Sequence, residues 1–301
     1  MIHQRRLALP RRQLILTFMR LQHDLAQSIA LIDTNRDLTL WKYIYGGKPK
    51  PFFHPLSTPA GHCLSIFEPH DHPWHRGLWF TIKLINGENF WEENVEHGTQ
   101  KTLAPPQVAH GQRERINIFS RQQWVRPREQ GVVFSEQREI SYQPLSGDSY
   151  AIDFYTNLTA KSQLVLDRTP YTTWGGYGGL IFRGTRNWQK TRLLFSDGST
   201  TDRPTGNRAD WADLSGTLDG GIDQQGGIAI FDHPQNLRHP TPWYGGTEKF
   251  QNYLNAAFLF HEPLEIEDGQ TLSFRYRVIV HDGLWDQARL AAEYGKYTSG
   301  P

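Results

Sequence analysis

The sequence predicts an all-β protein, a large antiparallel β-sandwich with a short C-terminal helix. Three observations support this: apolar residues alternate with polar ones along several segments, Gly, Pro, Asn and Asp separate those segments, and one late segment has helical periodicity. The chain has 301 residues, 38% of them hydrophobic, and no visible linker. Since all-β sandwiches run to about 250 residues as one unit, we expect one domain over 1–301, with 1–25 peripheral to it.

The best-defined strand starts at Leu78. From there to Leu84, every second residue is apolar, which places one row of side chains on one face of an extended chain. Asn86 and Gly87 both accept positive φ and predict a type I′ turn, after which "ENFW" begins the return strand. This segment is therefore predicted to be a β-hairpin.

Further strands follow from the same alternation and from the turn signals between segments. We expect them over 116–125, 132–142, 150–158, 192–196, 227–231 and 271–281. The segment 284–298 predicts the helix, because Leu284, Ala288 and Ala291 lie on one stripe. Asp282 is the expected N-cap.

Composition excludes several classes of function. The formal net charge of +1, with no long basic block, argues against nucleic acid as a partner. No apolar run approaches the roughly 18 residues of a membrane span. Arg11, Arg12 and Arg20 interrupt the apolar N-terminal residues, so no signal peptide is predicted. With Cys63 as the single cysteine, no intrachain disulfide forms, and we expect a cytoplasmic protein.

The stretch "EPHDHPWHRGLWF", residues 68–80, is the first candidate site. If the chain is extended before Pro73, then Glu68, His70 and His72 project from one side, and a turn brings His75 back to them. His70, His72 and His75 are the candidate ligands of one divalent metal ion. Alternatively, His72 and His75 transfer protons and Arg76 stabilises a negative charge. A third interpretation is a hydrogen-bonded loop without chemical function.

The stretch "YTTWGGYGGLIFRG" is the second candidate. Its two Gly-Gly pairs favour either a bulged strand in a tightly packed sheet or close contact with a ligand. It lacks the Lys-Ser/Thr ending of a phosphate loop. Arg183 ends the apolar part, and its guanidinium predicts an anionic or polyhydroxyl partner, or else an internal carboxylate.

The stretch "FDHPQNLRHPTPWY" is the third candidate, and "RADWADLSG" adds Asp213 beside Trp211. Polar groups again follow an apolar strand and precede an aromatic residue. Aromatic faces stack on sugar C–H surfaces, while Asp, Asn, His and Arg bind hydroxyl groups. We therefore expect these segments to line a carbohydrate cleft.

Seven motifs together carry a family resemblance: "PFFHPLSTPAG", "PHDHPWHRGLWF", "NGENFW", "YGGLIFRG", "WADLSG", "DHPQNLRHPTPW" and "FRYRVIVHDG". In this order, from about residue 51 to 283, the chain resembles the PmoA-like family, the domain of unknown function 6807. The family commonly has a second histidine where this chain has Trp74. The residues that match its pattern are His54, Asp71, His72, His75, Arg76, Trp91, Arg183, Asp213, His233, Asn236, His239 and Trp243.

The resemblance implies a role in carbohydrate catabolism and a supersandwich similar to that of galactose mutarotase. The family name points to a methane oxygenase subunit, which is a multi-span membrane copper protein. This chain has no apolar stretch long enough to cross a membrane, so we do not assign the oxygenase activity to it.

From these observations we expect an enzyme that binds a small carbohydrate and cleaves a glycosidic bond, by hydrolysis or by elimination from a keto sugar. The predicted catalytic residues are His72, His75, Arg76, Asp213 and His233. The predicted substrate-binding residues are His54, Trp91, Arg183, Asn236, His239 and Trp243. Two alternatives remain open, a sugar epimerase or mutarotase and a carbohydrate-binding protein without catalysis.

Overall fold

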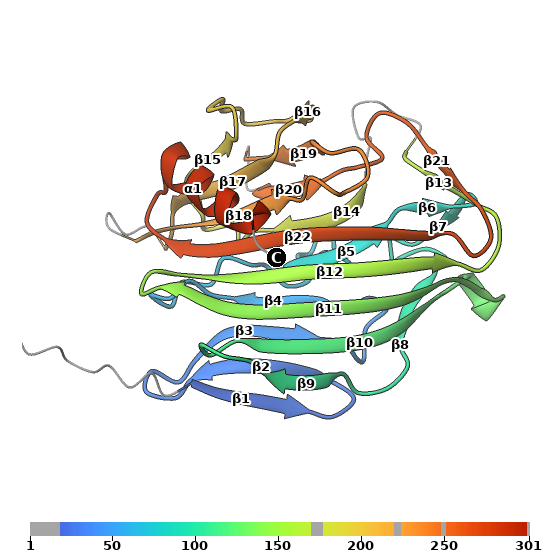
Figure 1. Cartoon of the computed structure of the whole chain (residues 1–301), viewed down its shortest axis with the longest axis horizontal. Coiled ribbons are helices and arrows are strands. Elements are labelled where there is room, and N and C mark those ends of the chain that lie inside the picture. The colour runs from blue at the N-terminus through green and yellow to red at the C-terminus, as the bar shows by residue number, and fades with distance from the viewer. Residues whose placement is uncertain (1–18, 170–176, 220–223, 248–250, 300–301) are drawn as a thin grey trace, which may run out of the picture.

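A computed structural model describes residues 19–169, 177–219, 224–247 and 251–299. Two large antiparallel sheets lie one behind the other and enclose the hydrophobic core (Figure 1). Within the described residues each of these sheets has nine strands, and a four-stranded sheet completes the fold. The predicted all-β antiparallel sandwich is thereby confirmed.

The first sheet carries the N-terminal strands at one edge, so residues 19–24 of the segment predicted to be peripheral form its edge strand. The preceding residues lie outside the described part of the chain. Its strand order is β1 (Met19–Asp24), β2 (Ser28–Asp33), β3 (Leu38–Ile44), β4 (Phe52–Leu56), β5 (Leu78–Ile82), β14 (Gly178–Arg183), β20 (Tyr253–Ala256), β19 (Pro242–Gly246) and β16 (Thr205–Arg208).

The second sheet contains the longest strands and the other predicted ones. Its order is β15 (Gln189–Phe195), β17 (Trp211–Thr217), β18 (Gln225–Asp232), β22 (Thr271–Asp282), β12 (Ser149–Ala160), β11 (Val132–Ser146), β10 (Ile116–Val125) and β8 (Thr99–Thr102), with β9 (Gln107–His110) also paired to β10. A 3₁₀ turn, η1 (Pro127–Glu129), follows β10.

The small sheet contains the predicted hairpin. Its order is β21 (Leu264–Ile266), β13 (Leu164–Asp167), β6 (Leu84–Ile85) and β7 (Glu88–Asn89). Asn86 and Gly87 join β6 to β7 with φ of 52° and 78°, which are the two positive values that a type I′ turn requires. The predicted turn and hairpin are confirmed, but the predicted strand from Leu78 to Leu84 is divided: β5 ends at Ile82 in the first sheet, and only Leu84–Ile85 pairs with Glu88–Asn89.

The core forms where the alternating apolar faces of the two sheets meet. Phe80 of β5 stacks on Phe154 of β12 with ring centroids 5.7 Å apart, and it also packs on Phe274 of β22. Phe80 and its apolar neighbours Leu78 and Ile82 are buried. Because side chains alternate along a strand, Trp79 projects from the opposite, outer face of the first sheet, where it is also buried.

The helix α1 (Gln287–Thr298) lies over the outer face of the second sheet near β17 and β18 (Figure 1). Leu290 packs there against Phe231 and Ile279. The predicted start at residue 284 and the predicted cap Asp282 were wrong, because β22 continues through Asp282. The N-cap is Asp286, whose carboxylate accepts a hydrogen bond of 2.8 Å from the Arg289 backbone nitrogen.

No helix among the described residues is long and apolar enough to cross a membrane.

Candidate functional site

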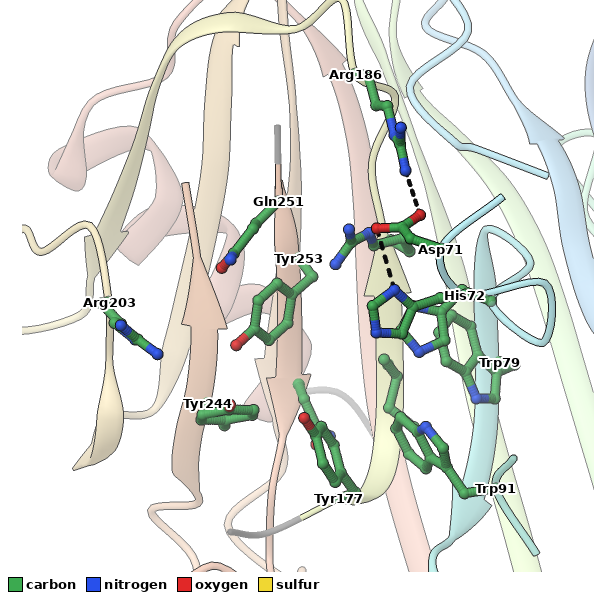
Figure 2. Close-up of a pocket in the computed structure, with 14 residues that line it drawn as sticks. Asp71, His72, Trp79, Trp91, Tyr177, Arg186, Arg203, Tyr244, Gln251 and Tyr253 are labelled. Carbon is green, nitrogen blue, oxygen red and sulfur yellow. Dashed lines mark hydrogen bonds and ion pairs between the residues drawn. The ribbon is translucent and has the colours of Figure 1, made fainter. Parts of the chain in front are cut away.

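A pocket of about 290 Å³ opens on the outer face of the first sheet. In Figure 2, His72, Trp79 and Trp91 form one wall, and Tyr244, Tyr253 and Arg203 form the other. The lining residues are Asp71, His72, His75, Trp79, Trp91, Tyr177, Ile181, Arg183, Arg186, Arg203, Tyr244, Gln251, Tyr253 and Asn255.

The alternation of side chains along β14 and β20 determines which residues form the floor of the pocket. In β14, Leu180 and Phe182 belong to the main core, so Ile181 and Arg183 project to the outer side. The same rule applies to Tyr253 and Asn255 of β20, which pairs with β14. One face of these strands therefore stabilises the sandwich while the other presents aromatic and polar groups to the pocket.

Gly178 and Gly179, at the start of β14, serve the packing of the sheet. Gly179 has φ of +102°, and a Cβ atom there would lie 2.1 Å from the Ala256 carbonyl oxygen. This glycine pair thus serves tight packing of the sheet, but the strand is not bulged, because Gly178 and Gly179 pair with Ile82 and Thr81 in continuous register. The other pair, Gly175 and Gly176, lies outside the described residues.

The loop before β5 supplies the histidines through turns. His72 donates its backbone N–H to the Pro69 carbonyl at 2.9 Å, and His75 donates to the His72 carbonyl at 2.9 Å. Glu68 has a positive φ of 47°. The expectation of an extended path that aligns Glu68 with His70 and His72 was therefore wrong, whereas the return of His75 beside His72 is confirmed, with ring centroids 4.7 Å apart.

His75 is a neutral imidazole in an aromatic environment. It is 8% exposed, and its ring centroid lies 5.2 Å from that of Trp79 and 5.9 Å from that of Trp91. Its Nδ1 is buried without a hydrogen-bond partner among the described residues. Burial, and then the positive charge of Arg183, lower the pKa of His75 well below its usual value. The side chain can therefore accept a proton at neutral pH.

Arg183 is a buried cation without a carboxylate partner among the described residues. It is 6% exposed, and its Nε is buried with no hydrogen-bond acceptor in the described part of the chain. The guanidinium carbon lies 5.6 Å from the centroid of the Tyr253 ring. Burial lowers the pKa of Arg183, but a guanidinium stays protonated in proteins. The pocket thus holds a fixed positive charge.

Three tyrosines continue the aromatic wall. Tyr244 lies between the other two, with ring centroids 5.4 Å from Tyr177 and 5.3 Å from Tyr253. Burial raises the pKa of Tyr177 and of Tyr253, so both phenols keep their protons at neutral pH. Both phenols therefore carry a proton that they can donate in a hydrogen bond, and the raised pKa makes each a weaker acid than free tyrosine.

Asn255 adds a polar group to the floor. Its Nδ2 donates to the carbonyl oxygens of Gly178 at 3.1 Å and Leu180 at 3.2 Å, which fixes the amide. Its Oδ1 is buried and has no donor among the described residues. Since buried polar atoms almost always have a partner, this oxygen points to a donor supplied by a ligand or water.

The rim of the pocket is charged and exposed. Asp71 forms an ion pair with Arg186 and lies 3.2 Å from the Nδ1 of His72 (Figure 2). Arg203 is exposed on the opposite wall. The side chain of His72 is 40% exposed, so it belongs to the entrance and His75 to the interior.

Arg76 follows His75 in the chain but does not reach the pocket. Its guanidinium donates to Glu68 at 2.8 Å and to both carboxylate oxygens of Glu93, at 2.8 and 2.5 Å. Glu93 also accepts from Lys50 at 2.6 Å. The predicted role of Arg76 at a reacting oxyanion is not supported, because its donors are engaged by two carboxylates.

Asp213 lies on the other side of the molecule. On β17 its neighbours Ala212 and Leu214 face the main core, so Asp213 projects from the outer face of the second sheet. There it is fully buried and lies 2.9 Å from Nε2 of His281. With the whole sandwich between Asp213 and His72, the two cannot form the predicted acid/base pair.

His233 and His239 also lie outside the pocket. His233 packs edge-on against Tyr297 of α1 with centroids 5.3 Å apart. His239 places Nδ1 2.8 Å from Asp232 and Nε2 3.3 Å from Asp210, and its hydrogen bond to Asp232 raises its pKa. These contacts are internal, so the structure does not bring either histidine to a shared cleft with His75.

The remaining predicted binding residues are held by the protein itself. Asn236 donates to Asp232 at 2.6 Å, and the indole nitrogen of Trp243 donates to the Ala209 carbonyl at 2.9 Å within the core. His54 places Nδ1 2.8 Å from the Ser65 hydroxyl and stacks on Phe67. Of the predicted site residues, the pocket contains His72, His75, Trp91 and Arg183.

The predicted three-histidine metal site is not assembled. His70 is exposed and does not line the pocket. Across the described ranges, no group of three or more His, Cys, Asp or Glu side chains is arranged to hold a metal ion. The turns at residues 69–75 separate His70 from the stacked pair His72 and His75.

Sequence reasoning missed most of the pocket. The residues that it did not select are Asp71, Trp79, Tyr177, Ile181, Arg186, Arg203, Tyr244, Gln251, Tyr253 and Asn255. Apart from Ile181, those on strands share one signal, an aromatic or polar side chain at every second position opposite an apolar row, as in Tyr253 and Asn255. The residues on loops carry no comparable signal.

The chain belongs to DUF6807, a family of unknown function, whose family model matches residues 34–295. The resemblance given by the seven motifs is confirmed. No curated protein matches the sequence.

Solved structures align with the chain at low similarity. A galactose mutarotase related enzyme from Lactobacillus acidophilus has 9% identity and a TM-score of 0.41, and the alignment covers 89% of this chain and 99% of that one. A GalM/aldose epimerase homologue from C. elegans has 8% identity and a TM-score of 0.36, with 88% and 99% covered. The chain thus has structural neighbours of the mutarotase kind, and the substrate and the reaction are argued below from the pocket alone.

Proposed function

We propose that this chain is an enzyme that acts on a sugar or glycoside in the pocket and cleaves a glycosidic C–O bond by elimination. The observation that carries the proposal is a buried, neutral histidine, His75, in one pocket with the cation Arg183, which has no carboxylate partner within the described ranges. Trp79, Trp91 and Tyr177 supply the flat surfaces on which sugar rings stack. A volume of about 290 Å³ suits one sugar ring.

The reaction begins at a C–H bond next to a carbonyl group of the substrate, either keto or carboxyl. His75 takes the proton, and Arg183 stabilises the negative charge that develops on the carbonyl oxygen. The electron pair then forms a C=C bond as the C–O bond to the leaving group breaks. Tyr253, which burial keeps protonated, gives its proton to the leaving oxygen. The products are an unsaturated sugar and an alcohol.

Elimination fits the described residues better than hydrolysis by a carboxylate pair. Glycosidases of the usual kind need two Asp or Glu residues on either side of the bond. Among the described lining residues, Asp71 is the single carboxylate, and it is engaged with Arg186 at the rim. A histidine base and a cationic oxyanion site therefore match the pocket.

The test is turnover of glycosides and their 3-keto derivatives, followed by NMR, with and without EDTA to detect a contributing divalent ion. We expect vinyl proton signals and loss of activity in His75→Gln. The matched control is His110→Gln, because His110 is an exposed histidine on β9. Release of a saturated free sugar without vinyl signals would indicate hydrolysis. Inversion of a stereocentre without bond cleavage would indicate an epimerase. Equal activity of His75→Gln and wild type would refute the proposed base.

A further inference from the structure

We infer that the substrate is a sugar acid whose single carboxylate binds Arg183. This inference rests on the proposed function and narrows its carbonyl group to a carboxyl group. It depends on the pairing of buried arginines in this fold, on the charge of the pocket and on the chemistry of the guanidinium.

Arg183 differs from the other deeply buried arginines of the described chain. Arg76 pairs with Glu93, and Arg138 donates to Glu136 at 2.7 Å in the interior of the sandwich. Arg183 has no such partner in the part of the chain that the structure describes, and Asp71 acts on it only at longer range. A buried charge without a partner is strongly unfavourable, so a site that retains one is arranged for a charged ligand.

The charged residues that line the pocket are mostly positive, as Arg183 is. The described lining residues include Arg183, Arg186 and Arg203, against the one carboxylate of Asp71. The ion pair with Arg186 neutralises Asp71 at the rim. Counted over the described lining residues, positive charge therefore remains inside, and a neutral sugar would leave it uncompensated.

The guanidinium suits a carboxylate. Its planar donors match the two oxygens of a carboxylate, and burial strengthens such charge-assisted bonds. Asn255 is 1% exposed, and its free Oδ1 accepts a bond from a donor. Sugar hydroxyls supply such donors, so Arg183 and Asn255 together recognise a ring that carries both groups.

A carboxylate at Arg183 also supports the proton transfer. Arg183 is among the charges that lower the pKa of His75, so an anion bound there offsets this effect and makes His75 a stronger base. In a uronic acid residue, His75 removes the proton on the carbon next to the carboxylate. A C=C bond forms to the neighbouring carbon, whose C–O bond breaks, and the leaving oxygen takes the proton of Tyr253.

The test is calorimetric binding of methyl glycosides of glucuronate, galacturonate and mannuronate, with the matching neutral glycosides and glucose 6-phosphate as comparison ligands. We expect wild type to bind at least one uronate more tightly than its neutral analogue. Arg183→Gln should lower uronate affinity roughly tenfold to a hundredfold, as expected for a charge-assisted bond, and change neutral binding little. Arg183→Lys should retain part of the affinity.

The control is Arg121→Gln, since Arg121 is an exposed arginine on β10 in the opposite sheet. Thermal unfolding confirms that each variant is folded. Equal affinity for uronate and neutral sugars, or an equal loss of both in Arg183→Gln, overturns the carboxylate assignment and leaves the proposed elimination from keto sugars intact. Tighter binding of the sugar phosphate also overturns it. If no sugar binds or reacts, both the inference and the proposed function are refuted.

Discussion

His75 and Arg76 are neighbours in the chain, but they belong to two regions with opposite polar chemistry. Behind the loop, Arg76 shares Glu68 and Glu93 with lysines, and each of its three guanidinium nitrogens donates to a carboxylate. On the pocket side, His75 and Arg183 have buried nitrogen atoms without partners in the described chain. One residue step thus separates a completed network from an incomplete one.

The comparison separates structural from functional polar groups. A buried ion pair that satisfies its own hydrogen bonds needs no ligand, and removing one partner destabilises the fold. An unpaired buried group lowers stability in the free protein and gains its partner when a ligand binds. The residue type, histidine or arginine, does not distinguish a structural group from a functional one. The presence or absence of a hydrogen-bond partner within the protein does.

The largest effect is expected at the pocket. His75→Gln removes the proposed base, and general base catalysis contributes about 10²- to 10⁴-fold to a rate. We expect kcat/KM to fall by that factor with little change in the free energy of unfolding. Steady-state kinetics beside urea denaturation measure both. A large loss of stability with unchanged kcat/KM would assign His75 to the structural region.

The next effect is expected behind the loop. Arg76→Gln leaves the Glu93 carboxylate buried and short of a partner, which costs about 3 kcal/mol in comparable pairs. Arg183→Gln removes an unpaired charge, so the free energy of unfolding should stay the same or rise. Urea denaturation of the two variants tests the contrast directly. An equal loss in both would show that Arg183 has a structural partner.

Tyr253→Phe should have a smaller effect. It keeps the aromatic wall but removes the proton donor, so we expect kcat to fall roughly tenfold or more while KM changes little. Substrates with a better leaving group need less help from an acid, so their kcat should fall less. A uniform loss for all leaving groups would remove Tyr253 from this role.

The pH profile provides a test without mutation. Burial and Arg183 lower the pKa of His75, so its basic form persists as the pH falls below 6.5. We expect the acid limb of kcat/KM for a neutral keto-glycoside to lie below the value of a free histidine, about pH 6.5. An acid limb above pH 6.5 would contradict a buried neutral base.

The smallest effect concerns His239, which belongs to a satisfied cluster. Its hydrogen bond to Asp232 raises its pKa in the folded state, with Asp210 adding to the effect. The charged pair therefore stabilises the fold fully below the unfolded pKa, about 6.5, and this contribution is lost as pH rises through the folded pKa. His239→Gln should thus reduce stability more at about pH 5.5 than at about pH 9. Urea denaturation at both values measures the difference.

The sequence predicted the fold well because its signal is local. The alternation from Leu78 and the pair Asn86 and Gly87 determine a strand and a turn from adjacent residues. The helix start was misplaced because Asp282 and Asp286 are both plausible caps, and the length of β22 decides between them. That length depends on pairing with β12 and β18, which are distant in sequence.

The candidate site was predicted in part, because histidines and arginines near strand ends mark functional sites only statistically. His75 and Arg183 were selected correctly as pocket residues, but Asp213 and His239 were selected by the same rule and lie in internal contacts. Tyr253 and Asn255 were not selected, because a polar or aromatic row opposite an apolar row is also the ordinary pattern of an antiparallel strand with one solvated face.

The sequence by itself determined the all-β class, the main long strands, the hairpin and the family of this protein. These follow from periodicity and motifs that neighbouring residues carry. Only the tertiary structure decided which polar side chains share a pocket and which already have partners. The physical reason is that hydrogen bonding and burial depend on strands paired across the whole chain, so His75 meets Arg183 while Arg76 meets Glu93.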